Sequence, residues 1–186
     1  MKIRRSLIAA AAAAALFVPI AACSSGSSSN SSTSTTVTSG EQVTDTECPF
    51  TGTVGSTSGG KSGTSSSLGS IVNSKQGCVD SMQLNLGSNV GAWTIAYATG
   101  PVIDGSGATV AAQGTATLVV TLQQGSWTGN PAAPTTVLPV QLDYVESINV
   151  VSGPGGSLLV VLGLSSKKPY QASDSQNPAY ISLGIG

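Results

Sequence analysis

The chain has 186 residues, a formal net charge of −1 at pH 7 and no histidine, and 8% of its residues are charged. Without histidine a Ser-His-Asp triad is excluded, and a zinc site would lack a common ligand. The length suits one domain with a modest core, preceded by a segment of different composition.

The first 22 residues predict an export signal that ends on a lipidation site. Lys2, Arg4 and Arg5 precede an apolar run over residues 7–18, and the small residues Ala21-Ala22 lead directly into Cys23. A basic region, a short apolar region and a small-residue processing site make a secretory signal peptide. A cysteine at the cleavage point is typical of bacterial lipoproteins, in which the sulfur receives a diacylglyceryl group and the cysteine becomes the new N-terminal residue.

Two other interpretations of this segment are an ordinary signal peptide with an incidental cysteine and an uncleaved membrane helix. The apolar stretch 7–22 has 16 residues, whereas a bilayer span needs roughly 20. We therefore expect Cys23 to carry diacylglyceryl and palmitate-type acyl chains that anchor the protein on the extracytoplasmic face of the cell membrane. The pair Arg4-Arg5 leaves the export route open between the general and the twin-arginine pathways.

Cleavage before Cys23 changes the charge of the chain. It removes every arginine and leaves four lysines against eight acidic residues, a net charge of −4. Phosphate binding needs clustered Lys and Arg, so nucleic acid is not expected as a partner. Electrostatic adsorption to anionic lipid is unfavourable for the same reason, and the expected membrane contact is the lipid on Cys23.

Residues 23–40 predict a disordered tether and residues 41–186 a single folded domain. The tether is rich in Ser, Thr and Gly, and such a composition cannot bury enough apolar area to order itself. With Cys23 acylated, Cys48 and Cys78 remain, and an even pair in an oxidising compartment favours a disulfide. The alternatives are a reactive thiol or a metal pair, which nothing else in the sequence supports.

The periodicity of the domain is two, which predicts an all-β fold, a sandwich or a small barrel. Alternating apolar residues occupy 81–86, 93–97 and 115–122, while 158–164 is apolar at nearly every position, as in a strand buried on both faces. Turn-forming sequences separate these runs. Residues 55–69 are expected to form a mobile loop, and residues 165–169 a hairpin turn with solvated lysines.

Motifs that could carry catalysis are weak in this chain. Residues 55–62 match the phosphate-binding pattern GxxxxGK[ST], but no helix is predicted after Lys61, as that motif requires. The carboxylates available for acid-base chemistry are sparse and stand mostly at turns or strand ends: Asp80, Asp104, Asp143 and Glu146. We expect no enzyme activity, no catalytic residue, no bound metal and no cofactor.

Four residues are the candidates for ligand contact. Trp127 lies in the polar stretch 123–136, where it could form an exposed platform or fold back as a lid on the core. Lys167, Lys168 and Tyr170 could meet an anionic ligand such as a peptide carboxylate, or simply form a solvated turn.

Several segments from Gly77 to the last strand follow a characteristic order and spacing: GCVDSMQL (77–84), WTIAY (93–97), GPVIDGSG (100–107), GTATLVVTL (114–122), VVLGL (160–164) and KPY (168–170). In this order and spacing the sequence resembles the AMIN-like domain of actinobacterial lipoproteins. Where the family has an aromatic residue followed by Asp-Arg, this chain has Cys78-Val79-Asp80-Ser81, so the family's basic residue is missing.

The resemblance implies a small antiparallel β-sandwich. AMIN domains proper occur in cell-wall amidases and pilus secretins, where they target peptidoglycan. We therefore expect a lipid-anchored, non-catalytic domain that binds a cell-envelope component, either peptidoglycan or a wall-associated protein. The alternatives are an envelope lipid or glycolipid carrier and a structural surface antigen.

Overall fold

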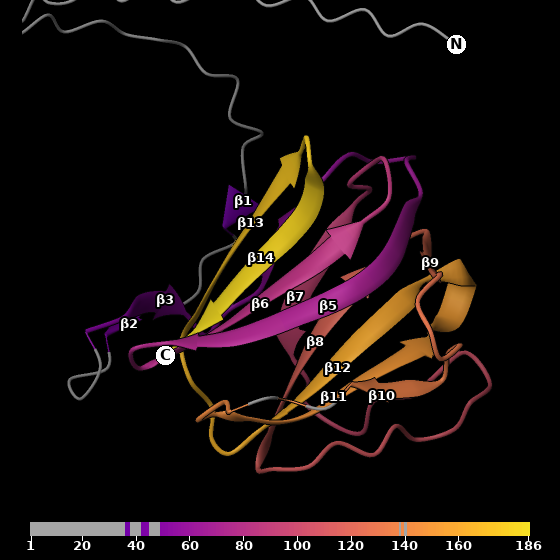
Figure 1. The fold of residues 1–186 in the computed structure, drawn as a ribbon. Helices are drawn as coiled ribbons and strands as arrows, with labels where there is room; N and C mark the ends of the chain where they lie inside the picture. The colour runs from indigo at the N-terminus through magenta and orange to yellow at the C-terminus, as the bar shows by residue number, and fades with distance from the viewer. Residues whose placement is uncertain (1–35, 38–41, 45–48, 138, 140) are drawn as a thin grey trace, which may run out of the picture. The chain divides into compact units, whose positions relative to one another are not determined.

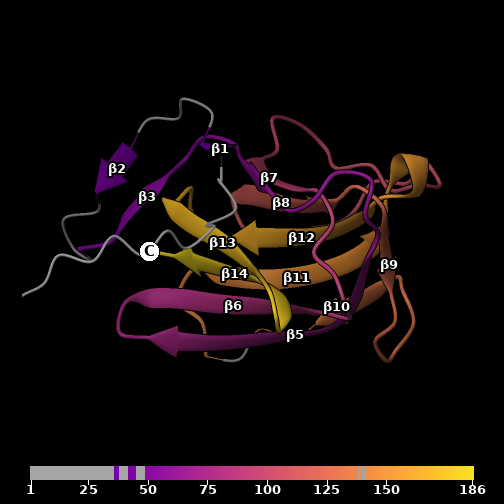
Figure 2. The same cartoon turned by 90° about the horizontal axis from the view of Figure 1, so that it is seen from above.

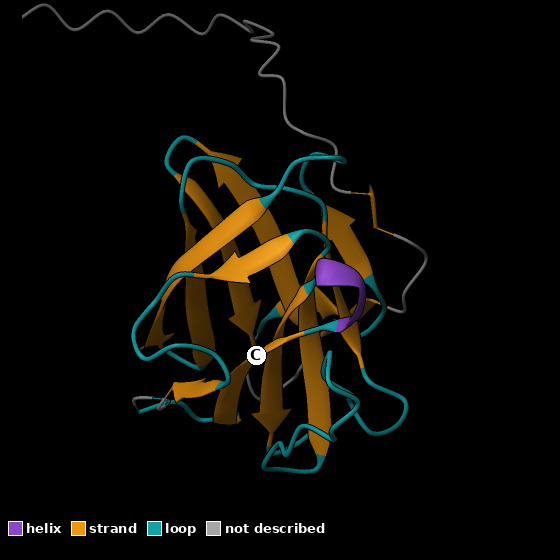
Figure 3. Cartoon of the chain, turned by 90° about the vertical axis from the view of Figure 1, so that its right-hand side faces the viewer, coloured by secondary structure: helices purple, strands orange, loops and turns teal. Residues whose placement is uncertain are grey.

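The computed structural model describes residues 36–37, 42–44, 49–137, 139 and 141–186, and these form a β-sandwich. Figure 1 shows the strands, and Figure 3 shows that helix is confined to the single turn η1 (Pro154–Gly156). The all-β prediction is confirmed. Among the described residues no helix has the length and apolar character needed to cross a bilayer.

Each of the two sheets has seven strands. Sheet A runs in the order β1 (Thr36–Val37), β4 (Thr57–Gly59), β7 (Trp93–Tyr97), β8 (Ala116–Leu122), β12 (Leu158–Leu164), β11 (Val145–Ser152) and β10 (Thr135–Val137). Sheet B runs in the order β2 (Gln42–Thr44), β3 (Thr51–Thr53), β13 (Tyr170–Gln176), β14 (Ala179–Ile185), β6 (Val79–Leu86), β5 (Ser66–Gln76) and β9 (Gly125–Trp127). Neighbouring strands are antiparallel, except that β5 and β9 are parallel.

The main core lies between the two sheets, which Figure 2 shows as two layers. Strands β6, β8 and β14 alternate between buried and more exposed residues, and the buried members face the opposite sheet. The largest fully buried side chains include Trp93, Tyr170 and Ile181. Because a slip of one residue would expose this whole set, the apolar alternation fixes the register of the strands.

Strand β12 is buried at every position, as the sequence predicts for a strand covered on both faces. Its outer face belongs to a second apolar cluster, in which Leu159, Val161 and Val151 pack against residues of the segment 98–115. We call this segment the strap and the surface under it the covered face. The strap is pinned to sheet A by backbone hydrogen bonds at both ends, from Ala98 N to Thr117 O (2.9 Å) and from Thr115 N to Leu164 O (2.8 Å).

Two local predictions are wrong. Residues 55–69 contain β4 and the start of β5 rather than one continuous loop. Position 59 of β4 requires glycine, because a Cβ there would lie 2.5 Å from the Trp93 ring. The strand therefore contacts the core through glycine backbone and lacks the apolar side chains by which a strand is normally recognised in a sequence. Residues 165–169 do not form a hairpin turn, because they connect β12 of sheet A to β13 of sheet B.

Candidate functional site

The outer face of sheet B is built from three rows of side chains that run across four strands. Directly opposed residues of antiparallel strands place their side chains on the same face, so the pairing register defines these rows. From β13 through β14 and β6 to β5, the rows are Ser175-Tyr180-Asn85-Ser70, Ser173-Ser182-Gln83-Val72 and Gln171-Gly184-Ser81-Ser74. We call these residues the serine face.

None of the residues of the serine face carries a charge, and half of them are serines. Their polar groups are hydroxyls and carboxamides, which can both donate and accept hydrogen bonds. Some are already joined, since Gln83 Nε2 donates to Asn85 Oδ1 (2.7 Å) and Asn85 Nδ2 donates to Ser70 Oγ (3.1 Å). Unlike the covered face, this surface leaves the aliphatic side chain of Val72 54% exposed.

A groove of about 620 Å³ lies over the β13 side of the serine face. Its floor contains small side chains, among them Ser81, Ser182 and Gly184, and its wall is formed by Phe50 and the residues of β3. Strands β3 and β13 are paired at one position, Thr53 with Tyr170, so β3 is free to form a wall beside the rest of β13. The volume falls in the range of ligand pockets, roughly 300–1,000 Å³.

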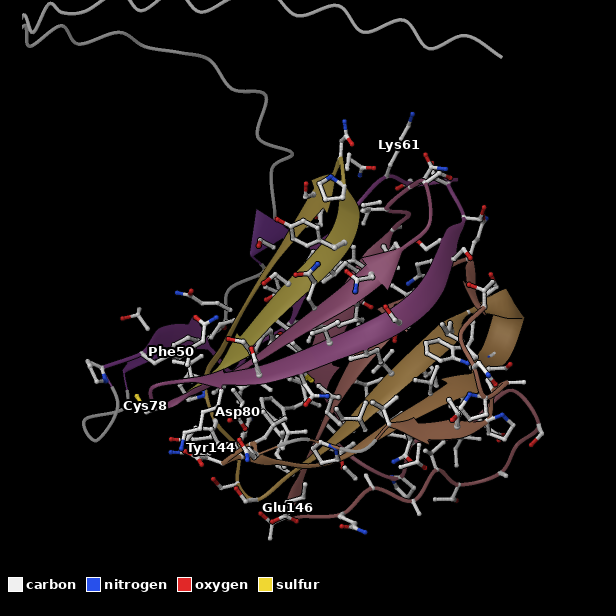
Figure 4. All side chains as sticks on the ribbon, in the orientation of Figure 1. Phe50, Lys61, Cys78, Asp80, Tyr144 and Glu146 are labelled. Carbon is white, nitrogen blue, oxygen red and sulfur yellow. The ribbon has the colours of Figure 1, made fainter. Side chains whose placement is uncertain are left out.

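Phe50 forms an aromatic end to this groove. Figure 4 shows its ring at the end of sheet B where the chain terminates. A Cβ on Gly186 would lie 2.7 Å from Phe50 Cγ, and one on Gly52 would lie 2.9 Å from Phe50 Cε1, so the ring packs directly on glycine backbone. The half-buried ring is thereby held by its surroundings while it lines the groove.

Asp80 is a structural carboxylate that joins the two sheets. Its side chain is fully buried on β6 and accepts three backbone hydrogen bonds, from Asp143 N (2.9 Å), Tyr144 N (2.7 Å) and Val145 N (3.0 Å). Figure 4 shows Asp80 and Tyr144 next to each other at this junction. A buried carboxylate is costly unless it is hydrogen-bonded, and these amides supply that compensation at the start of β11.

The other candidate carboxylates lie apart from the groove. Asp104 accepts hydrogen bonds from Ser106 N, Ser106 Oγ and Ala108 N, and the Ser106 hydroxyl is the main cause of its lowered pKa. Asp143 forms an ion pair with Lys75 (2.7 Å), and Glu146 is exposed on β11. In the described part of the chain no group of three or more His, Cys, Asp or Glu residues is arranged to hold a metal ion.

Trp127, one of the four predicted ligand contacts, packs against the main core from β9. Its indole Nε1 donates to Pro131 O (2.7 Å), and a Cβ on Gly129 would lie 2.2 Å from the ring, so the partly buried ring packs directly on the loop backbone. This arrangement corresponds to the lid interpretation of Trp127.

The other three predicted contacts do not form one binding surface, although they are close in the sequence: Lys167, Lys168 and Tyr170. Lys167 Nζ is 5.1 Å from the centroid of the Tyr97 ring, and Lys168 Nζ is 4.6 Å from that of Tyr144. The Tyr170 side chain is fully buried, and its hydroxyl is within hydrogen-bond distance of Gly55 O (2.5 Å) and Ile95 O (2.8 Å). Ligand contact by these residues stays a prediction.

A second groove, of about 650 Å³, is lined by Tyr97 and Lys167. The Tyr97 hydroxyl donates to Lys168 O (2.5 Å) and accepts from Lys168 N (3.0 Å), and burial raises the pKa of Tyr97 to about 12. Tyr97 therefore fixes the connection between the two sheets. Of the four predicted ligand contacts, Lys167 is the one that lines this second groove.

The cysteine predictions fall largely outside the described residues. Cys23 and Cys48 both lie there, so acylation of Cys23 and pairing of Cys48 with Cys78 stay predictions. Cys78 occupies the tight turn between β5 and β6, after Gly77, whose positive φ of 63° permits that turn. The predicted disulfide would therefore attach residue 48 to the end of this hairpin.

The described fold is that of a small β-sandwich in which the outer face of sheet B is uncovered and uncharged and the outer face of sheet A is covered by the strap. Residues 68–185 match the AMIN-like domain family, and the chain belongs to that family. The resemblance to the AMIN-like domain noted from residue 77 onward is thus confirmed, and the match extends back to Leu68. No curated protein and no solved structure matches the chain.

Proposed function

We propose that this protein is a non-catalytic, lipid-anchored module on the extracytoplasmic face of the cell membrane that binds peptidoglycan. Membership of the AMIN-like family supports a role at the cell wall. The observation that carries the proposal is the serine face with its groove, an open surface of hydroxyl and carboxamide groups beside an aromatic wall. The expected lipid on Cys23 would hold this surface close to the wall polymer.

Binding is tested by sedimentation with insoluble peptidoglycan. The sandwich has its own core, so a soluble chain that begins at residue 24 is suitable. We expect this chain to be recovered in the pellet with peptidoglycan and to remain in the supernatant with cellulose. Recovery wholly in the supernatant in both cases would contradict the proposal. Binding only to a sacculus that retains its attached proteins would instead favour a wall-associated protein as partner.

The anchor is tested separately by labelling cells with a radioactive fatty acid. We expect the wild-type chain to incorporate the label and to fractionate with membranes. Cys23→Ser should lose the label and leave the membrane fraction, while Cys78→Ser, which keeps the acylation site, should stay labelled. Membrane association of an unlabelled Cys23→Ser chain would contradict lipid anchoring. A co-purifying lipid beyond the anchor would favour the carrier alternative.

A further inference from the structure

The charged side chains of the described domain avoid the serine face. The four lysines lie elsewhere: Lys61 before β5, Lys75 in the ion pair with Asp143, and Lys167 and Lys168 between β12 and β13. The acid on β13, Asp174, sits in the inward register, where its Oδ1 accepts from Trp93 Nε1 (3.1 Å). The face is therefore electrically neutral in a domain with an excess of acids.

This neutrality restricts the chemistry of the ligand. Phosphate or carboxylate groups are recognised by Arg and Lys through charge-assisted hydrogen bonds, and no described residue of the face offers one. Ammonium groups would need acidic partners, which are also missing among the described residues of the face. A ligand that brings unpaired charge to this surface would lose hydration without compensation, so the face discriminates against it.

The groups present on the face match neutral sugars. A sugar hydroxyl both donates and accepts a hydrogen bond, as do the serine hydroxyls, and an acetamido group can pair with the carboxamides of Gln83, Asn85 and Gln171. Antibody contact surfaces are likewise rich in Ser, Asn and Gly, which supply adaptable hydrogen bonding, and in Tyr, which supplies a rigid contact area. At the end of the groove the Phe50 ring offers an apolar plane against which the CH face of a pyranose ring can pack.

We propose that the serine face and the Phe50 groove bind the neutral N-acetylated glycan of the wall polymer, and not its charged peptide stems. This inference rests on the proposed function and assigns it to one face of one sheet. The glycan would lie across β13, β14 and β6, with one sugar ring against Phe50 and its hydroxyl and acetamido groups on the rows that contain Ser81, Ser173 and Ser182.

The experiment compares two Ser→Glu variants of the chain from residue 24. Ser182→Glu places a carboxylate in the middle row of the serine face, and Ser152→Glu places one at the exposed end of β11 in sheet A. Binding is measured to an N-acetylglucosamine oligomer by calorimetry and to insoluble peptidoglycan by sedimentation. We expect Ser182→Glu to bind both probes about tenfold or more weakly, and Ser152→Glu to bind like the wild type.

Thermal unfolding of each variant establishes that it is folded, and Ser173→Glu, at an exposed position of β13, replaces Ser182→Glu if that variant is not. If the folded variant sediments with peptidoglycan like the wild type, or if released peptide stems bind and the oligomer does not, this inference is overturned while the proposed function stands. If the wild type itself fails to sediment, both fall.

Discussion

The outer faces of the two sheets differ in composition and in exposure. Sheet A carries aliphatic side chains there and buries them under the strap, where Leu159 is 6% and Val161 0% exposed. Sheet B carries hydroxyls and carboxamides and has no strap in the described part of the chain. An uncovered apolar sheet would invite association, whereas an uncovered polar sheet is stable in water and free to bind a ligand. The covered face of sheet A therefore serves stability, whereas the serine face of sheet B is available for recognition.

The largest expected difference between the faces is the cost of removing an aliphatic side chain. Leu159→Ala empties a site that the strap and sheet enclose, so we expect a loss of about 2–5 kcal/mol in the free energy of unfolding. Val72→Ala on the serine face removes a side chain that is 54% exposed and should change stability by no more than about 0.5 kcal/mol. Chemical denaturation of both variants measures the contrast, and similar losses at the two positions would refute it.

A matched pair of glycines gives the next largest effect. A Cβ on Gly163 of β12 would lie 1.9 Å from Gln113 O, a backbone atom of the strap, whereas a Cβ on Gly184 of β14 has its nearest neighbour, a Val79 methyl carbon, at 3.4 Å. We expect Gly163→Ala to displace the strap at a cost of about 1–3 kcal/mol and Gly184→Ala to stay within about 0.5 kcal/mol. Equal unfolding midpoints for the two variants would show that the strap does not press on β12.

The smallest expected effect concerns the turn within the strap. The Ser106 hydroxyl and the amides of Ser106 and Ala108 lower the pKa of Asp104 from its ordinary value of 3.8. A carboxyl whose pKa is lowered by folding contributes stability above its unfolded value and loses that contribution as the pH falls through the folded value. Asp104→Asn should therefore be slightly less stable than wild type at neutral pH, and the gap should close in acid. A gap that does not change with pH would contradict the assigned hydrogen bonds.

The covered sheet could be predicted from the sequence far better than the bare one. The apolar run 158–164 is sufficient to predict a strand buried on both faces, because burial leaves a hydrophobic signal at every position. Strand β5 carries mostly Ser, Gly, Asn and Lys, and its one fully buried aliphatic residue, Leu68, does not by itself indicate a strand. Its parallel pairing with β9 is a tertiary arrangement without a local signature.

The candidate site was missed at the sequence level for a related reason. Each residue of the serine face is merely the polar member of an alternating strand, and the face exists only once Ser173, Ser182 and Gln83 are aligned by register. The residues that stood out in the sequence were aromatic or charged, and Trp127 and Tyr170 are used largely in packing. Phe50 has no local signature of its role, because that role depends in part on contact with Gly186, which follows far along the chain.

The most direct test of the account is a map of backbone amide chemical shifts on addition of an N-acetylglucosamine oligomer. We predict that the shifts concentrate on β13, β14 and β6 around Ser173, Ser182 and Ser81, and at Phe50, while the strap stays unchanged. Shifts confined to the strap, or to the groove lined by Lys167, would place recognition on another surface. They would contradict the claim that the serine face of sheet B binds the glycan.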